Sequence, residues 1–285
     1  MTGVDFKKLK AESHTAKLKP LFAIIIGPSG AGKSSVCGTI GVSTLVLHNS
    51  VEHHGPLAAR TAGRGEVVGL DYTVFNAKGD IDVEKTLANL LAILRDENVQ
   101  KEFGAVVLDS ATELQKIVAQ TDEFRKYCLT DKGTHNSFKE GEAYIFLLKK
   151  YMIDPFVKLN NAGLHVITTC AADVKSLSED GAVSECSPKL LGFSVAHDLI
   201  RAFSDVLLVS RVVDVDDETG ESKSTHRLLF KANISKQSKD IKGQVLKTAN
   251  FSPRISGFTL NELPDTAPAD LSKIIIGREK QAKKA

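Results

Sequence analysis

The sequence predicts an α/β protein in which a mainly parallel central sheet is covered by helices on both faces. Two observations support this fold class: several short apolar runs are typical of buried strands, and segments with helical spacing separate most of them. The expected strands are LFAIII (21–26), STLVLHN (43–49), YTVFNA (72–77), GAVVLD (104–109), LHVITTC (164–170) and DVLLVSRV (205–212).

The expected helices lie between these runs. Apolar side chains in DVEKTLANLLAILRD (82–96) recur at helical spacing. Because the residue before a proline disfavours helical geometry, the longest helix should kink before Pro155. The segment 60–69 contains three glycines and is expected to be a loop. The expected helices are one that begins near Lys33, then 82–96, 112–128, 143–163 and 193–203.

The chain is expected to form one main domain with two appendages. Residues 212–232 alternate in polarity around ETGES and predict a β-hairpin near the carboxyl end of the domain. The expected division is a basic amino-terminal arm (1–19), the core (20–250) and a carboxyl-terminal extension (251–285) that ends in the basic tail GREKQAKKA. No internal repeat is evident.

Composition and charge exclude several classes of protein. Of 285 residues, 42% are hydrophobic and 25% charged, an ordinary globular balance, and the net charge of +2 is too small for general adhesion to nucleic acid. No apolar run is long enough for a transmembrane helix, and the amino terminus lacks the apolar region of a secretion signal. We therefore expect a cytoplasmic protein that does not bind membranes. The cysteines, Cys37, Cys128, Cys170 and Cys186, form no CxxC pair, which favours reduced thiols.

The segment IIIGPSGAGKSS (24–35) contains a complete phosphate-binding motif. Glycines let the backbone N–H groups of such a loop point at phosphate oxygens, and the following helix adds its positive end. In this motif Lys33 reaches the β- and γ-phosphates and the hydroxyl of Ser34 is a ligand for Mg²⁺. The expected nucleotide-binding residues are Gly27, Pro28, Ser29, Gly30, Ala31, Gly32, Lys33, Ser34 and Ser35.

A second acidic position follows the apolar strand VVLDS (106–110). A carboxylate at the end of such a strand holds Mg²⁺ in phosphate-loop enzymes, which makes Asp109 the expected metal and catalytic partner of Ser34. The alternative is that Asp109 caps the next helix. Both roles are compatible, because Ser110 is also available as the cap.

The segment VVLDSATEL resembles the second nucleotide motif of the RecA-like recombinases. The order of features after Asp109 is also similar: a helix, a polar loop, a long helix, a strand, a variable segment and the element GFSVAH (192–197). The resemblance spans roughly 21–212 and is strongest toward the small RecA-like ATPases of bacteriophages that act in single-strand annealing and recombination. It implies a RecA-like P-loop NTPase fold, ATP and Mg²⁺ as cofactors, and a location in the host bacterial cytoplasm if the chain is phage-encoded.

The same resemblance points to a general base. RecA-like enzymes carry a glutamate just beyond the strand that follows the first helix, and Glu52 stands there in VLHNSVEHHG. General-base catalysis needs a carboxylate near the attacking water, although a solvated loop acid is the alternative. The histidines of this loop, His48, His53 and His54, lack further ligands at metal-binding spacing.

Other roles follow from the resemblance alone. Thr168 and Thr169 end a strand where the family senses the γ-phosphate, and Thr169 is the expected contact; β-branched residues of an ordinary strand are the alternative. His197 would sense nucleotide across a subunit interface, unless it is a structural histidine. These roles predict a homo-oligomer.

The resemblance also implies that two loops, 129–141 and 171–191, contact single-stranded DNA. Phe138 is the one aromatic side chain in them that could stack on a base. Acidic residues in the second loop would repel the phosphates of DNA. The loop residues that could contact phosphates are Lys132, His135, Lys139, Lys175 and Lys189. The acidic residues of the second loop are Glu179, Asp180 and Glu185. A separate basic run later in the chain comprises Lys231, Lys236, Lys239, Lys242 and Lys247. A solvated surface is the alternative for the later run, from which Lys231 could reach a neighbouring subunit's nucleotide.

The sequence thus predicts a Mg²⁺-dependent, DNA-stimulated ATPase in which Lys33, Glu52 and Asp109 are catalytic. It would act on single-stranded DNA in recombination or annealing, beside a single-strand-binding protein. Two alternatives remain open. A P-loop small-molecule kinase would need lid arginines, for which Arg60 and Arg64 are the candidates. A nucleotide-gated assembly module with little turnover would require Glu52 to point away from the γ-phosphate.

Overall fold

The computed structural model describes residues 19–52, 54–176, 183–191, 193–215, 222–230, 245–248, 253–258 and 266–282. In that part of the chain no helix is long and apolar enough to cross a membrane. Residues 1–18 of the amino-terminal arm, the centre of the hairpin expected around ETGES and the basic run from Lys231 to Lys242 lie outside the described residues.

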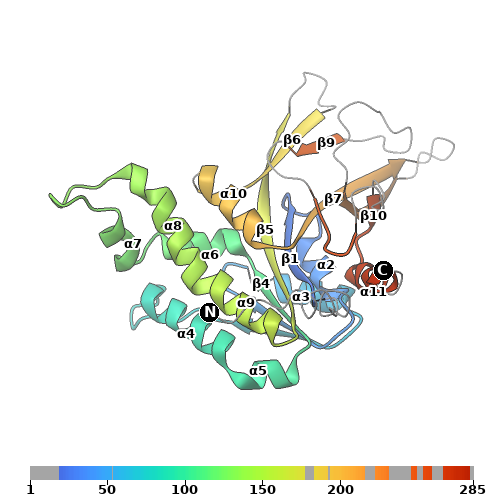
Figure 1. The fold of residues 1–285 in the computed structure, drawn as a ribbon, viewed down its shortest axis with the longest axis horizontal. Coiled ribbons are helices and arrows are strands. Elements are labelled where there is room, and N and C mark those ends of the chain that lie inside the picture. Colours follow the sequence, from blue (N-terminus) through green and yellow to red (C-terminus); the bar gives the residue numbers. More distant parts are fainter. Residues whose placement is uncertain are drawn as a thin grey trace, which may run out of the picture.

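The core of the molecule is one mixed sheet with the order β10-β8-β7-β1-β5-β4-β2-β3 (Figure 1). The neighbours from β7 to β3 are parallel, whereas β8 and β10 are antiparallel additions at one edge. The strands are β1 (Phe22–Gly27), β2 (Thr44–His48), β3 (Val67–Asp71), β4 (Ala105–Asp109), β5 (His165–Ser176), β7 (Asp205–Val215), β8 (Ser222–Leu229) and β10 (Thr266–Pro268). The α/β class and the mainly parallel sheet are confirmed, as is the pairing of β7 with β8 in the expected hairpin.

Helices cover both faces of the sheet, and the alternation of side chains in β1 shows it. Ile24 and Ile26 enter one hydrophobic core, while Ala23 and Ile25 enter the other. The first core contains residues of α4, α6, α8, α9 and α10; the second contains residues of α2, α3 and α11. The helices are α2 (Lys33–Gly38), α3 (Gly55–Ala62), α4 (Val83–Arg95), α5 (Glu97–Glu102), α6 (Ala111–Val118), α7 (Asp122–Tyr127), α8 (Glu140–Leu148), α9 (Asp154–Asn161), α10 (Phe193–Ala202) and α11 (Leu271–Ala282).

Three expected elements were wrong in detail. The third strand is Val67–Asp71, not 72–77, and α3 occupies part of the segment expected to be a loop. Tyr72 is fully buried. The aromatic residue at this position therefore packs in the core and does not belong to a strand. The expected helix over 112–128 is two helices, α6 and α7, because Thr121 caps the second by accepting from Phe124 N.

The expected kink before Pro155 is a change of helix type. The chain runs from α8 through a π-helix (Lys149–Ile153) into α9, so the unusual turn directly precedes the proline. Proline has no N–H to donate and its ring crowds the carbonyl four residues earlier, which accounts for the altered turn.

The described residues of the segment 171–191 are mostly strand, where a loop was expected. β5 continues to Ser176, and β6 (Val183–Pro188) returns antiparallel to it, with β9 (Val245–Thr248) beside β6. Residues 271–282 form α11, a helix that the sequence did not indicate. Leu271 N at the start of α11 donates to Thr39 Oγ1 over 2.8 Å, which joins that helix to the end of α2.

We predict that His165 makes the stability of the fold depend on pH. Its Nδ1 accepts from Leu21 N over 3.0 Å, just before β1, and burial, with a smaller contribution from Arg278, lowers its pKa. A lowered folded pKa means that acid protonates the unfolded chain first, so this contribution is present above the ordinary histidine pKa and is lost as pH falls below it. The melting temperature should therefore fall between pH 7.5 and 5.5.

The matched variant is His165→Asn, which keeps an acceptor but cannot titrate. Its melting temperature should depend less on pH over the same interval. An identical pH slope in the two proteins would contradict this role of His165.

Candidate nucleotide-binding site

The phosphate motif forms the turn that joins β1 to α2. Gly30 and Gly32 have φ angles of 75° and 89°, a region that residues with a side chain rarely adopt. Lys33 folds back over the turn, and its Nζ donates to Gly27 O (2.9 Å) and Pro28 O (3.0 Å). The ammonium group thus lies against the loop whose N–H groups would receive phosphates.

Close packing explains two of the glycines. A Cβ at Gly27 would lie 2.6 Å from the carbonyl oxygen of Val209, and one at Gly32 would lie 2.7 Å from Nδ1 of His226. His226 belongs to β8 and is exposed beside the loop. No local signal in the sequence indicated this contact, because nearly two hundred residues separate the two positions.

Asp109 connects three elements at the carboxyl edge of the sheet. Its side chain is 3% exposed, and Oδ2 accepts from Ser34 Oγ over 2.6 Å, while Oδ1 accepts from Thr169 Oγ1. β5 lies between β1 and β4, which places Thr169 between the phosphate loop and Asp109. The structure therefore brings together the expected residues Ser34, Asp109 and Thr169.

The alternative role of Asp109 as a helix cap is not the one observed. Ser110 is the N-cap of α6, and its hydroxyl accepts from Glu113 N over 3.4 Å. The carboxylate of Asp109 is consequently directed to Ser34 and Thr169. The peptide bond between Asp109 and Ser110 is cis.

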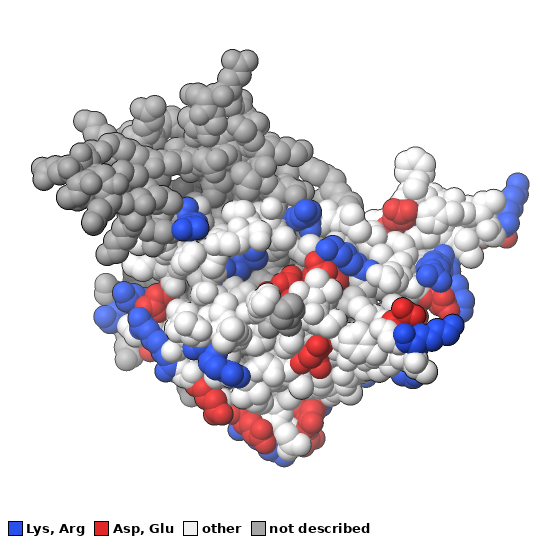
Figure 2. All heavy atoms as spheres, turned by 180° about the vertical axis from the view of Figure 1, so that it is seen from behind, with Lys and Arg blue, Asp and Glu red and all other residues white. Residues whose placement is uncertain are grey.

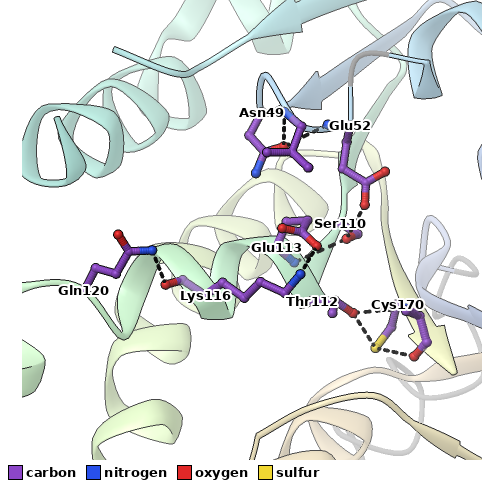
Figure 3. Close-up of polar contacts among 10 residues, drawn as sticks. Asn49, Glu52, Ser110, Thr112, Glu113, Lys116, Gln120 and Cys170 are labelled. Carbon is purple, nitrogen blue, oxygen red and sulfur yellow. Dashed lines mark hydrogen bonds and ion pairs between the residues drawn. The ribbon is translucent and has the colours of Figure 1, made fainter. Parts of the chain in front are cut away.

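Glu52 is held against this cluster by a short turn after β2 (Figure 3). Asn49, which is 2% exposed, accepts through Oδ1 from Glu52 N over 3.0 Å and from Val51 N over 3.1 Å. The Glu52 carboxylate accepts from Ser110 Oγ over 3.3 Å. Asn49 is a positioning residue that the sequence analysis missed, although an asparagine that caps a turn two residues on is a known local signal.

The electrostatics of the cluster are coupled. Burial raises the pKa of Glu52, and the nearby carboxylates of Asp109 and Glu113 raise it further. Burial lowers the pKa of Lys33, opposed chiefly by the charge of Asp109. A carboxylate with a raised pKa binds protons more readily than usual, which suits a group that must accept one.

The residues at this edge fit a magnesium ion. Hydroxyl and carboxylate oxygens are the ligands that Mg²⁺ uses in proteins, and those of Ser34 and Asp109 lie 2.6 Å apart. A Cβ at Gly55, at the start of α3, would lie 2.2 Å from Asp109 Oδ2, so only glycine fits there. Among the described residues, no three His, Cys, Asp or Glu side chains cluster as another metal site, and His53 lies outside them.

Other expected residues lie apart from these contacts. Thr168 donates to Leu108 O over 3.1 Å, the ordinary strand role. His48 Nδ1 lies 3.0 Å from Asn49 O, and His197 is half-buried on α10. Ser29 is exposed on the loop, and Ser35 is half-buried in α2.

Comparisons with known proteins show a weak similarity of fold. No protein-family model matches the sequence, and no curated protein matches it. Among solved structures, the flagellar accessory protein FlaH from Methanocaldococcus jannaschii is similar with a TM-score of 0.35 and 12% sequence identity. The match covers 79% of this chain and 86% of that one, and at this level it assigns the chain to no family.

We predict that Thr169→Val lowers nucleotide turnover by about tenfold to a hundredfold, because it removes a buried hydrogen bond to the Asp109 carboxylate. Thr168→Val is the matched control on the same strand, since the Thr168 hydroxyl donates only to backbone carbonyls, those of Leu108 and Thr169. Steady-state ATP hydrolysis and melting temperature should be measured for both. Equal losses of turnover in the two variants would show that Thr169 has no special role.

Proposed function

We propose that this chain binds ATP with Mg²⁺ and hydrolyses it, and that its core is RecA-like. The observation that carries the proposal is the convergence of Lys33, Ser34, Asp109 and Glu52 at one edge of the sheet. Ser34 bonds directly to Asp109, and Glu52 is bonded to the residue beside it. Phosphoryl transfer to water requires a cation at the phosphates, ligands for the metal and a general base for the water. Lys33, the pair Ser34 and Asp109, and Glu52 would supply these groups in turn.

Each of these side chains has a distinct role in the proposed reaction. Lys33 would neutralise charge on the β- and γ-phosphates, and the loop N–H groups would orient them. Ser34 and Asp109 would hold the metal, which when bound supplies charge stabilisation at the phosphates. Glu52 would orient the attacking water and accept its proton, assisted by the raised pKa of its carboxylate.

The contacts of the two candidate lid arginines disfavour the kinase alternative. Arg64 pairs with Asp270 over 2.7 Å beside α11, and its Nη1 donates to Ser272 Oγ. Arg60 Nε donates to Val67 O over 3.3 Å. Both arginines have partners in the body of the fold, which disfavours a role over the phosphates.

The assembly-module alternative required Glu52 to point away from the site. The contact with Ser110 and the electrostatic coupling of Glu52 to Lys33 and Asp109 instead support a catalytic position. Turnover is therefore part of the proposal.

We further propose that the ATPase acts on single-stranded DNA in recombination or annealing, as a homo-oligomer beside a single-strand-binding protein. The resemblance around Asp109 supports this part, together with the loop between α7 and α8, which projects from the body (Figure 1). Phe138 at that loop is 93% exposed and could stack on a base. Figure 2 shows acidic and basic side chains interspersed on one face of the described surface, so a DNA contact there would be local.

The first test is ATP hydrolysis by the wild-type chain, with and without single-stranded DNA. Glu52→Gln should retain ATP binding and lose turnover by about a hundredfold or more, the usual contribution of a general base. Lys33→Ala should lose affinity for ATP. Glu66→Gln is the control, because Glu66 is exposed and takes no part in these contacts. Full turnover in Glu52→Gln would refute the assignment of the base.

The DNA contact has a separate test. Phe138→Ala should lower affinity for single-stranded DNA by about tenfold through the lost stacking, while DNA-free hydrolysis stays unchanged. Phe75→Ala, another exposed phenylalanine at 52% exposure, is the matched control. Fluorescence anisotropy with a labelled oligonucleotide measures both. Equal affinity in the wild type and Phe138→Ala would remove this loop from the proposed contact.

A further inference from the structure

A cavity of about 370 Å³ lies at the amino end of β1, the end opposite to the phosphate loop. Phe22, Val157 and Ala202 give it apolar walls. Lys19 and Arg278, both basic residues, also line it. Its volume falls in the range of about 300–1,000 Å³ that is usual for sites of small organic ligands.

Arg278 is the unusual member of this lining. It belongs to α11 and is 2% exposed. Its guanidinium donates to Ser256 O (2.9 Å), Ser256 Oγ (2.6 Å) and Lys19 O (3.0 Å). These bonds use Nε and Nη2 and all go to neutral oxygens, and none of them uses Nη1.

Asp205, the acid whose charge raises the pKa of Arg278, accepts its hydrogen bonds from other residues. The Asp205 carboxylate accepts from Phe22 N (3.1 Å), Ser204 Oγ (2.7 Å) and Ser256 N and Oγ (2.7 and 2.8 Å). It is therefore bonded to Arg278 only through the hydroxyl of Ser256. Burial lowers the pKa of Arg278, and the charge of Asp205 opposes the shift. A guanidinium this buried carries a desolvation cost.

We propose that this cavity is a binding site for a small organic anion, a carboxylate or phosphate carried on an apolar body. The guanidinium of Arg278 would take the anionic group, as its planar fork suits both chemistries, and Lys19 would add a second positive charge at the rim. The apolar body would lie against Phe22, Val157 and Ala202. A bound anion would offset the buried positive charge.

The site is distinct from the nucleotide site, because Phe22 opens β1 and Gly27 closes it. The inference therefore does not depend on the ATPase proposal.

The test is isothermal titration of the full-length chain with benzoate, phenyl phosphate and the neutral isostere benzamide. We expect benzamide to bind at least about tenfold more weakly than the better of the two anions, because it forfeits a charge-assisted hydrogen bond. Preference for benzoate or for phenyl phosphate identifies the anionic group.

Variants locate the site. Lys19→Ala and Arg278→Gln should each weaken anion binding at least about threefold, while Lys158→Ala, an exposed lysine of α9, should not. Lys19 is exposed, so Lys19→Ala keeps the test valid if Arg278→Gln fails to fold. Equal binding of benzamide, no binding up to about 10 mM, or no effect of Lys19→Ala would each overturn the proposal.

Discussion

The carboxylate of Asp109 is the interaction on which the rest of the site depends. It is buried at the end of β4, where its two oxygens accept hydrogen bonds from Ser34 on α2 and Thr169 on β5. An unpaired carboxylate would be costly in this position, so both hydroxyls must be in place for the strand to end there. The order of the sheet satisfies this requirement, because β5 separates β1 from β4 and supplies the second donor. The strand order of the fold thus brings the residues of the site together.

The surroundings of this carboxylate leave little freedom. Gly55 approaches it so closely that any side chain there would clash with Oδ2, and Gly27 and Gly32 are constrained in the same way by β7 and β8. The charges are also interdependent: the pKa of Lys33 is lowered by burial but supported by Asp109 and Glu52, while Asp109 raises the pKa of Glu52. The pKa values of Lys33 and Glu52 therefore both depend on the charge of Asp109.

Much of the fold could be predicted from the sequence because it is encoded locally. Buried parallel strands are apolar runs, and the phosphate loop, Asp109 and Glu52 follow them directly. The misses have physical reasons. β3 is an edge strand with Gly69 at its centre, so it lacks a buried strand's continuous apolar character, while the buried aromatic Tyr72 beside it suggested the wrong segment. Contacts such as Gly32 with His226 arise from tertiary packing, which no local pattern reports.

The most direct test of the account is the effect of Mg²⁺ on ATP binding by the wild type and by Asp109→Asn. Asparagine preserves the size of the side chain but removes its charge, which is the property the metal requires. We predict that Mg²⁺ strengthens ATP binding by the wild type and that Asp109→Asn loses this increment while still binding nucleotide without metal through Lys33 and the loop. An undiminished effect of Mg²⁺ in Asp109→Asn would contradict the central role given to this carboxylate.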